Sequence, residues 1–333
     1  MNRTMNKTMN KTMNKTMNKT MNKTMNKTMN KAMSKPFSQS MSKSITRLVL
    51  ALIFSQTLLA KAADINIQWL GGPTMLIEFN GMQILTDPML GEGEHAFEMA
   101  DPNEMFDLKK GPEIRFHRRL TALPDIDLTS LDLVLLSHAH EDHFDQKAQS
   151  TLAKSLPFIL PIDDVNKVKK AGFTLLNALP AGQTKMYTTG QGQIHITAIP
   201  ADHTDNKTLE PLLGHGLGYL IKFIEGKQEF TLYWTGDTLA TPSVINAVKA
   251  LGEIDLLIPN MGRVGTTGPL GKISMGATDV IKLANTLNVK KVFPIHHTSY
   301  ELYLEPISEL SKLASNQTWG LDILSEGSRL SYK

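Results

Sequence analysis

The chain has 333 residues, which is enough for one large domain or two ordinary ones. Of its 35 Lys and Arg residues, 12 lie at or before Lys61, whereas the 32 acidic residues begin at Asp64, so residues 63–333 carry 23 basic and 32 acidic side chains and a net charge of −9. This acidity argues against nucleic acid as a partner. The absence of cysteine excludes disulfides, thiolate metal sites and a cysteine nucleophile.

The N-terminal segment is low-complexity sequence followed by an export signal. Residues 1–40 consist largely of Met-Asn-Lys-Thr copies, and one apolar residue in four, set among Asn and Thr, predicts disorder. Residues 41–62 combine basic residues, an apolar run at 48–60 and an Ala-Lys-Ala cleavage pattern, which is typical of a secretory signal peptide. We therefore expect a periplasmic or secreted protein with no stable membrane span after cleavage. Met33 and Met41 are candidate translation starts.

Residues 63–333 show no break in composition and predict a single domain. Strands come first in consecutive pairs and then alternate with helices, which favours a layered α/β fold with two central sheets covered by helices. Short apolar segments rich in β-branched and aromatic residues predict strands at 65–70, 75–79, 82–86, 133–137, 193–199, 218–223, 230–235, 255–259 and 291–295. Helical periodicity predicts helices at 145–156, 163–171, 242–251, 278–287 and 306–314.

The densest group of chemically active side chains is His138, His140, Asp142 and His143. It lies between an apolar run that predicts a buried strand and a predicted helix. A strand-to-helix turn lets these side chains converge, and imidazole is the commonest neutral nitrogen ligand for metals. Buried imidazoles without a partner would each cost roughly 1–3 kcal/mol. The cluster therefore predicts a metal site.

Three further candidate ligands, His203, Asp237 and His296, each follow a predicted strand. The carboxyl ends of strands are where layered α/β proteins gather their sites. Each residue alone is a weak signal, but their order after the histidine cluster strengthens the prediction. His297 follows His296 directly, and adjacent residues at a strand end point to opposite sides, so the spacing leaves both histidines open as ligands.

The pattern resembles the metallo-β-lactamase superfamily, whose H-x-H-x-D-H motif matches residues 138–143. Within it, the sequence is most similar to the branch that contains L-ascorbate-6-phosphate lactonase and N-acyl-phosphatidylethanolamine phospholipase D. The residues that carry this likeness are Trp-Leu-Gly at 69–71, Thr-Asp-Pro at 86–88, Gly-Asp-Thr at 236–238 and Pro-Ile-His at 294–296. The likeness extends over nearly all of residues 64–300. The branch often has His after the first triplet, whereas this chain has Gly72.

The resemblance implies a four-layer αββα sandwich with two mixed central sheets covered by helices. Its Pro-x-His register favours His296 over His297 as a ligand. We expect Asp87 to support a ligand histidine from outside the ligand set. The ligands implied by the resemblance are His138, His140 and His203 on one ion, Asp142, His143 and His296 on the other, and Asp237 bridging the two.

Imidazole and carboxylate ligands suit Zn²⁺ and also Mn²⁺ or Fe. Two ions about 3.5–4 Å apart can share a hydroxide, lower its pKa towards about 7 and polarise the oxygen of the group that it attacks. We therefore expect two divalent metal ions, zinc before Mn or Fe, and metal-assisted hydrolysis. Asp142 is also expected to act in catalysis by orienting the bridging hydroxide.

Several features bear on the substrate. Members of the family that hydrolyse β-lactams commonly have Cys or Ser where Asp237 stands, so we expect a small ester, lactone or phosphodiester instead. The long segment 91–120 is basic and predicts a lid in which Arg118 and Arg119 bind an anionic small molecule, with a solvated surface as the alternative. His215, in a glycine-rich turn, is a further candidate substrate contact or an ordinary turn residue.

Two other functions fit the same ligands. Iron in this site would suit a di-iron oxidoreductase. A protein of the same fold could also bind metal without turnover. Metal analysis separates iron from zinc, and a hydrolysis screen separates an enzyme from a metal-binding protein.

Overall fold

The computed structural model describes residues 64–333. The repeat at 1–40 and the signal peptide predicted at 41–62 lie outside these residues, so both stay predictions. Within the described part, none of the helices has the length and apolar character needed to cross a bilayer.

The first sheet has seven strands, of which one half is antiparallel and the other half parallel. In sheet order they are β16 (Arg329–Tyr332), β1 (Ile65–Gly71), β2 (Thr74–Phe79), β3 (Met82–Thr86), β6 (Leu133–Leu135), β7 (Phe158–Leu160) and β8 (Leu176–Ala178). The turn between β2 and β3 has positive φ angles of 48° at Asn80 and 83° at Gly81. An Asn-Gly pair tolerates these angles, which explains the tight hairpin that joins the two strands.

The second sheet repeats this arrangement with seven strands of its own. In sheet order they are β15 (Gly320–Leu321), β14 (Lys291–Val292), β13 (Leu256–Ile258), β12 (Gln228–Trp234), β11 (Gly216–Glu225), β10 (Gln193–Ala201) and β9 (Thr184–Thr188). Strands β9 to β12 are antiparallel, and β12 to β15 are parallel.

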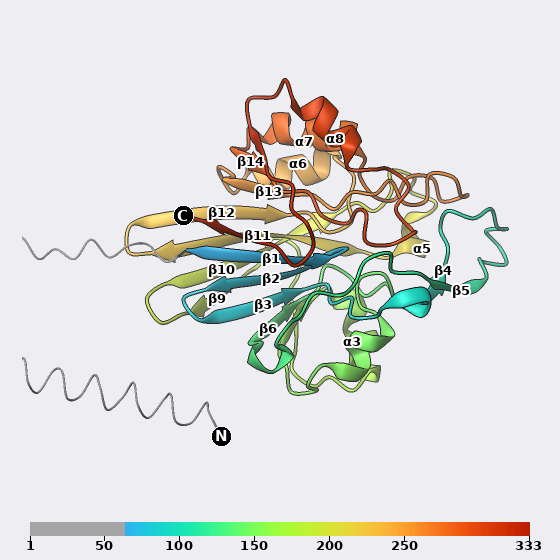
Figure 1. Cartoon of the computed structure of the whole chain (residues 1–333), viewed down its shortest axis with the longest axis horizontal. Coiled ribbons are helices and arrows are strands. Elements are labelled where there is room, and N and C mark those ends of the chain that lie inside the picture. The colour runs from blue at the N-terminus through green and yellow to red at the C-terminus, as the bar shows by residue number, and fades with distance from the viewer. Residues whose placement is uncertain (1–63) are drawn as a thin grey trace, which may run out of the picture. The chain divides into compact units, whose positions relative to one another are not determined.

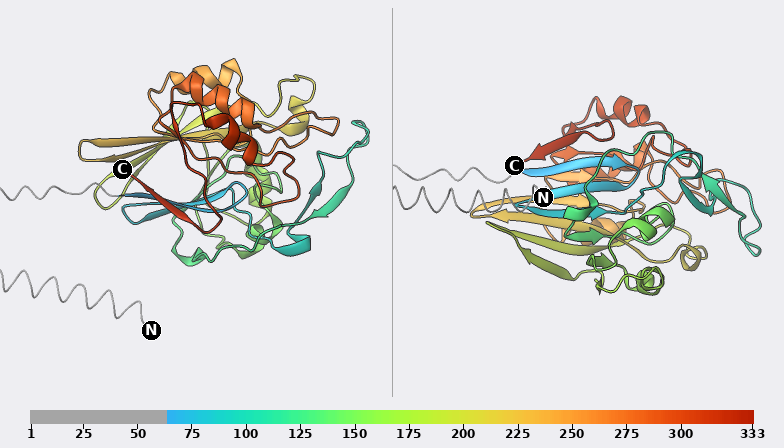
Figure 2. Two further views of the ribbon diagram at one scale, coloured as in Figure 1. Left: turned by 45° about the horizontal axis from the view of Figure 1, so that its top comes forward. Right: turned by 60° about the horizontal axis from the view of Figure 1, so that its bottom comes forward.

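Helices cover the outer face of each sheet and complete four layers (Figures 1 and 2). The first sheet is covered by α3 (Gln146–Thr151) and α4 (Val165–Lys170), which share an apolar cluster with its strands. The second sheet is covered by α6 (Pro242–Lys249), α7 (Ala277–Leu287) and α8 (Ser308–Ala314). The predicted αββα sandwich with two mixed sheets is therefore confirmed.

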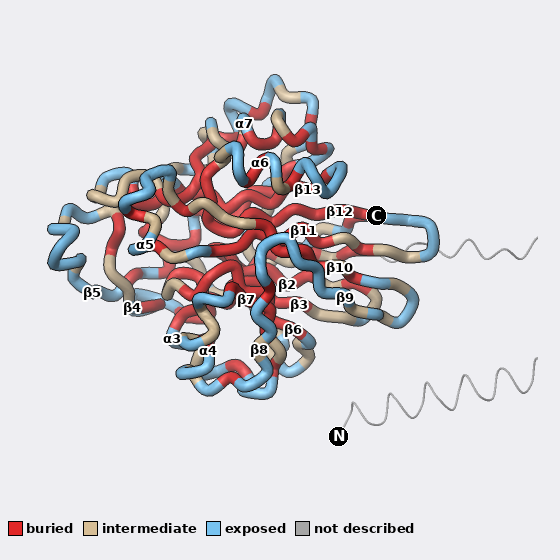
Figure 3. The backbone as a smooth tube through the Cα atoms, turned by 180° about the vertical axis from the view of Figure 1, so that it is seen from behind, coloured by how far each residue is buried: buried red, intermediate tan, exposed pale blue. Residues whose placement is uncertain are grey.

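The interior between the sheets is apolar and closed to solvent, as the buried central strands in Figure 3 show. Trp69 from the first sheet and Tyr219 and Trp234 from the second are at most 2% exposed. Burial of an aromatic or aliphatic side chain contributes roughly 1.5–3 kcal/mol. Packing in this interior fixes the position of one sheet relative to the other. The strand ends that carry the site are therefore also fixed relative to each other.

The structure also differs from the sequence prediction in several short elements. The helix predicted at 145–156 ends at Thr151, because Leu152 has extended backbone angles of −66° and 141°. The segment 91–120, predicted as a lid, contains a small hairpin of β4 (Phe97–Ala100) and β5 (Ile114–His117). The remaining elements are α5 (Glu210–Leu213) and three 3₁₀ turns, η1 (Gly93–His95), η2 (Leu128–Ser130) and η3 (Ile162–Asp164).

Candidate metal centre

The seven residues predicted as ligands gather at one edge of the molecule, where strands of both sheets end. β3 and β6 run parallel in the first sheet, and β10, β12 and β14 share one direction in the second. In chain order, His138, His140, Asp142 and His143 follow β6, His203 follows β10, Asp237 follows β12 and His296 follows β14.

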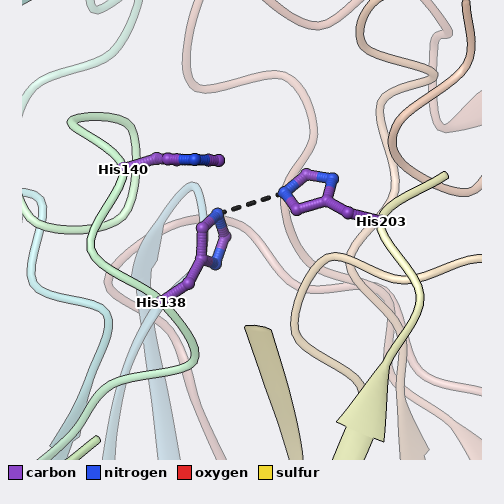
Figure 4. A group of neighbouring side chains, drawn as sticks. All are labelled: His138, His140 and His203. Carbon is purple, nitrogen blue, oxygen red and sulfur yellow. Dashed lines mark hydrogen bonds between the residues drawn. The ribbon is translucent and has the colours of Figure 1, made fainter. Parts of the chain in front are cut away.

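His138, His140 and His203 form the first group, and their rings converge in Figure 4. Their candidate ligand atoms all lie within 4.8 Å of one another, and the Nε2 atoms of His138 and His203 are 3.2 Å apart. Nδ1 of His203 donates a hydrogen bond to the carbonyl of Ile273 at 2.8 Å. Because a carbonyl only accepts, Nε2 of His203 keeps its lone pair, which suits metal binding.

Asp142, His143 and His296 form the second group, whose candidate ligand atoms also lie within 4.8 Å of one another. Nδ1 of His296 donates to the carbonyl of Met261 at 2.7 Å, which leaves Nε2 as the ligand atom. The Nε2 atoms of His143 and His296 are buried and have no hydrogen-bond partner. A buried polar atom without a partner costs about 1–3 kcal/mol, so this pair fits a cation that would bind both nitrogens.

Asp237 faces the second group. Its Oδ2 lies 3.5 Å from Nε2 of His143, and its Oδ1 lies 3.8 Å from Nε2 of His296. The side-chain amide of Asn260 donates to Oδ1 of Asp237 at 2.9 Å and accepts a hydrogen bond from Nε1 of Trp234 at 3.0 Å. This chain of hydrogen bonds fixes the carboxylate beside the imidazoles and ties it to the interior between the sheets.

Asp87 lies behind the histidines and is completely buried. Its Oδ2 accepts a hydrogen bond from Nδ1 of His143 at 2.6 Å and one from the hydroxyl of Ser137 at 2.5 Å, and its Oδ1 accepts one from the backbone N–H of Ser137 at 2.7 Å. The Ser137 hydroxyl is also 3.0 Å from Nδ1 of His138. Asp87 thus contacts the nitrogen of His143 that faces away from the other ligands, as expected for a supporting carboxylate.

The pKa values in the site respond to burial and to the neighbouring charges. Burial and the adjacent imidazoles lower the pKa of His138 well below its ordinary value and that of His140 to about 3. Burial opposes ionisation of Asp237, but the imidazoles of His296 and His143 hold its pKa well below its usual range. Burial alone would lower the pKa of His143, yet the carboxylates around it, Asp237 first, raise that pKa well above its ordinary value. A metal cation would compete with the proton held there.

The backbone is strained where it presents the site residues. Asp87 has a φ of 30° and His296 a φ of 62°, values that L residues rarely adopt. Such strain is typical of functional sites, where the surrounding structure holds it. Gly236 has a φ of 56°, and a Cβ there would lie 2.5 Å from the carbonyl oxygen of Leu217. Glycine is therefore required immediately before Asp237.

The two adjacent histidines, His296 and His297, have different surroundings. Unlike His296, His297 belongs to neither group of candidate ligands. Its ring packs against Trp69 with centroids 4.7 Å apart, and its Nδ1 is 2.7 Å from the hydroxyl of Thr298. The positive φ of His296 turns its side chain into the site, which the spacing alone did not decide.

Of the two arginines predicted as substrate contacts, Arg119 needs correction. The Arg119 side chain is fully buried and donates to Tyr300, to the carbonyl of Leu70 and to Glu326, which it meets at 2.7 Å. It therefore holds the structure together away from the cavity. Arg118 is exposed, lies 3.5 Å from Glu94, and is absent from the cavity next to the ligands. The buried position of Arg119 argues against the predicted contact for that residue, whereas a substrate contact of Arg118 stays a prediction.

His215 lies on a second cavity of about 400 Å³, which shares only His203 with the cavity beside the other ligands. Its Nδ1 is 2.9 Å from a carboxylate oxygen of Asp163, and its side chain is 69% exposed. A substrate contact of His215 stays a prediction.

Sequence reasoning missed Tyr303. Its hydroxyl is buried without a partner, and its ring centroid lies 4.5 Å from that of His296. Burial, together with the charges of Tyr300, Asp142 and Asp237, raises the pKa of this phenol well above its ordinary value. A tyrosine in a C-terminal loop carries no sequence signal for such a position, because only folding brings that loop to the strand ends.

Proteins similar to this chain in sequence and structure include hydrolases. A family model described as a beta-lactamase superfamily domain matches residues 66–296. Over 199 residues the chain is 25% identical to a UPF0173 metal-dependent hydrolase of Pyrococcus furiosus, covering 59% of this chain and 80% of that protein. Over 259 residues it is 23% identical to N-acyl-phosphatidylethanolamine-hydrolyzing phospholipase D 1 of Caenorhabditis elegans, covering 74% and 68%. The crystal structure of isothiocyanate hydrolase from Delia radicum gut bacteria has a TM-score of 0.64 at 21% identity, covering 80% of this chain and 99% of that one.

The chain therefore belongs to the beta-lactamase superfamily. The match confirms the family and the fold predicted from the sequence, and it agrees with the prediction of a metal-dependent hydrolase.

Proposed function

We propose that this protein is a binuclear metal-dependent hydrolase that acts on a small ester, lactone or phosphodiester. The observation that carries the proposal is the pair of buried Nε2 atoms of His143 and His296, which have no hydrogen-bond partner among the described residues and lie beside the carboxylates of Asp142 and Asp237. Buried nitrogens without a hydrogen bond lower the stability of the fold, so their presence favours a functional role such as metal binding. The hydrolase relatives support the same reaction type.

The side chains of the site have separate tasks in this proposal. Asp142 belongs to the second group and also lines the cavity. Its carboxylate can therefore accept a hydrogen bond from the attacking water and orient it. Asp87 keeps Nδ1 of His143 protonated, so that Nε2 remains a ligand atom. The residues that would hold the two ions are His138, His140 and His203 for one, and Asp142, His143 and His296 for the other, with Asp237 between them.

The donor set contains only imidazole and carboxylate, which suits zinc first and also Mn²⁺ or Fe. When bound, two such ions lower the pKa of a water molecule towards about 7 and polarise the oxygen of the scissile group.

The same proposal includes export. The basic segment, apolar run and cleavage pattern at 41–62 support a periplasmic or secreted enzyme. Mass spectrometry of the expressed protein would give the mature N-terminus, which we expect near Ala63. A mature chain that keeps residues 41–62 would refute export by cleavage.

The test of function combines metal analysis with a hydrolysis screen. We expect two ions per chain, hydrolysis of at least one ester, lactone or phosphodiester, and loss of both after strong chelation. His138→Ala should lower metal content and activity together, because it removes a ligand atom of the first group. His195→Ala is the matched control, since the ring of His195 lies on β10 and contacts Gln193 outside the site. Activity that survives complete metal removal would end the proposal.

Two alternatives are outcomes of the same test. Bound iron together with oxygen consumption would identify a di-iron oxidoreductase. Two bound ions with no turnover across the screen would identify a metal-binding protein that does not catalyse.

A further inference from the structure

A cavity of about 500 Å³ lies directly against the candidate metal centre. His140, Asp142 and His203 form part of its wall, so a ligand in the cavity would touch both groups of candidate ligands. The volume is within the range of about 300–1,000 Å³ that is usual for small-molecule sites. The cavity is therefore where the part of a substrate that does not react would lie.

Much of the rest of the wall is apolar. This apolar part includes Met99 and Ile114 from the β4–β5 hairpin, Leu213 from α5, and Leu270 and Ile273. Ile114 is 69% exposed although it lines the cavity. The hairpin projects from the domain on the side where β12 ends (Figure 1). An apolar side chain exposed at the wall of a cavity gains from being covered by an apolar ligand.

The cavity has no lysine or arginine in its wall, and the charged side chains that line it besides Asp142 are Glu98 and Glu141. The nearby basic side chains are each paired with a carboxylate. Arg115 lies 3.0 Å from Asp101, outside the wall, and Lys167 lies 2.6 Å from Glu141, so it neutralises one of the two glutamates of the wall. A negative charge on the non-reacting part of a substrate would meet no cation there and would lie near Glu98.

We propose that the enzyme selects uncharged esters or lactones whose non-reacting part is a compact apolar group, and that it discriminates against substrates with an anionic group in that part. This inference rests on the proposed function and names its substrate class. Bound metal ions act on the scissile group of every substrate alike, so the wall of the cavity sets the difference between substrates. The β4–β5 hairpin thus contributes to specificity, because its apolar side chains would contact the apolar part of the substrate.

The first experiment compares p-nitrophenyl esters on the metal-loaded protein. From acetate to hexanoate, kcat/KM should rise by up to about fourfold for each added methylene. The monoester of adipic acid has the same chain as the hexanoate with a terminal carboxylate, and its kcat/KM should be at least about tenfold lower. A flat dependence on chain length, or an adipate monoester that reacts as fast as the hexanoate, would overturn the inference and leave the proposed hydrolase function intact.

The second experiment needs no turnover. Calorimetry on the metal-free protein compares hexanamide with adipamate, which differ only by the terminal carboxylate. We expect hexanamide to bind at least about tenfold more tightly, and equal or reversed affinities would overturn the inference. If no ester, lactone or phosphodiester is hydrolysed, the proposed function fails, while this binding comparison still decides whether the cavity prefers uncharged ligands.

Two variants link the preference to the hairpin. Ile114→Lys places a cation on the exposed apolar wall, so the ratio of hexanoate to adipate activity should fall about tenfold or more. Glu98→Gln removes the acidic group and should shift the ratio in the same direction by a smaller factor. Met186→Lys is the matched control, because Met186 is also an exposed apolar residue, 65% accessible, and lies on β9 outside the cavity. An Ile114→Lys ratio equal to that of the control would refute the role of the hairpin.

Discussion

Replacement of Asp87 by Asn tests whether the ligand histidines depend on the carboxylate behind them. In the structure, Asp87 accepts the N–H of His143 at 2.6 Å and two hydrogen bonds from Ser137. An Asn side chain has the same shape but keeps only one accepting oxygen. If that oxygen stays with the backbone N–H of Ser137, the amide NH₂ faces Nδ1 of His143, donor against donor. His143 then avoids the conflict by moving its proton to Nε2, where it blocks the metal.

The expected loss follows from this conflict. Carboxylates that support ligand histidines typically contribute 10- to 100-fold to metal affinity, or about 1.4–2.7 kcal/mol. We expect Asp87→Asn to weaken metal binding by that factor. The free energy of unfolding of the metal-free protein should fall less, because the neutral amide removes the cost of burying a carboxylate, whose pKa burial raises.

Metal affinity would be measured by competition with a chelator, and unfolding by denaturant titration of the metal-free chain. Asp132→Asn is the matched control. Its Oδ2 accepts the backbone N–H of Gln83 at 2.8 Å, and it precedes β6, whereas the histidines follow that strand. The control should keep full metal affinity. An Asp87→Asn variant that binds metal as tightly as the parent would refute the reasoning.

Four further predictions follow from single contacts. His296→Ala should lower metal content and His297→Ala should not, by elemental analysis; the reverse result would exchange the two roles. Arg119→Met should cost about 3–5 kcal/mol in unfolding free energy, because it leaves Glu326 without its buried partner; a change in KM without loss of stability would restore a substrate contact. Tyr303→Phe should leave stability unchanged or raise it by up to about 1 kcal/mol, since the lost hydroxyl has no partner; a clear loss in denaturant titration would reveal one. Burial raises the pKa of Asp145 to about 6, so the folded state retains a proton that the unfolded chain releases near pH 4, and stability falls by roughly 2–3 kcal/mol as pH rises from 4 to 6. That fall should be absent in Asp145→Asn, and identical pH profiles of the two proteins would contradict it.

The sequence by itself determined the fold class and the candidate ligands. Long strands such as β10 and β11 carry continuous apolar patterns, and the period of side chains along a strand is a local property. The motif at 138–143 is also local, so its residue types and spacing already define a set of nitrogen and oxygen ligands. Several strands of two to four residues, such as β4, β7 and β15, are too short to show a period and were missed.

Only the tertiary structure decided how charges pair and which way a side chain points. A basic segment looks the same in sequence whether its arginines face a substrate or a carboxylate, and Arg119 meets Glu326, which lies 207 residues further along the chain. His296, and not His297, lies among the candidate ligands, and its ring and backbone N–H contact the carbonyls of Met261 and Gly72, which are distant in the sequence. The apolar cavity wall likewise joins the β4–β5 hairpin with α5 and residues 270–273, segments that meet only after folding. Interactions between residues far apart in the sequence therefore decided the lining of the site, because no local pattern encodes them.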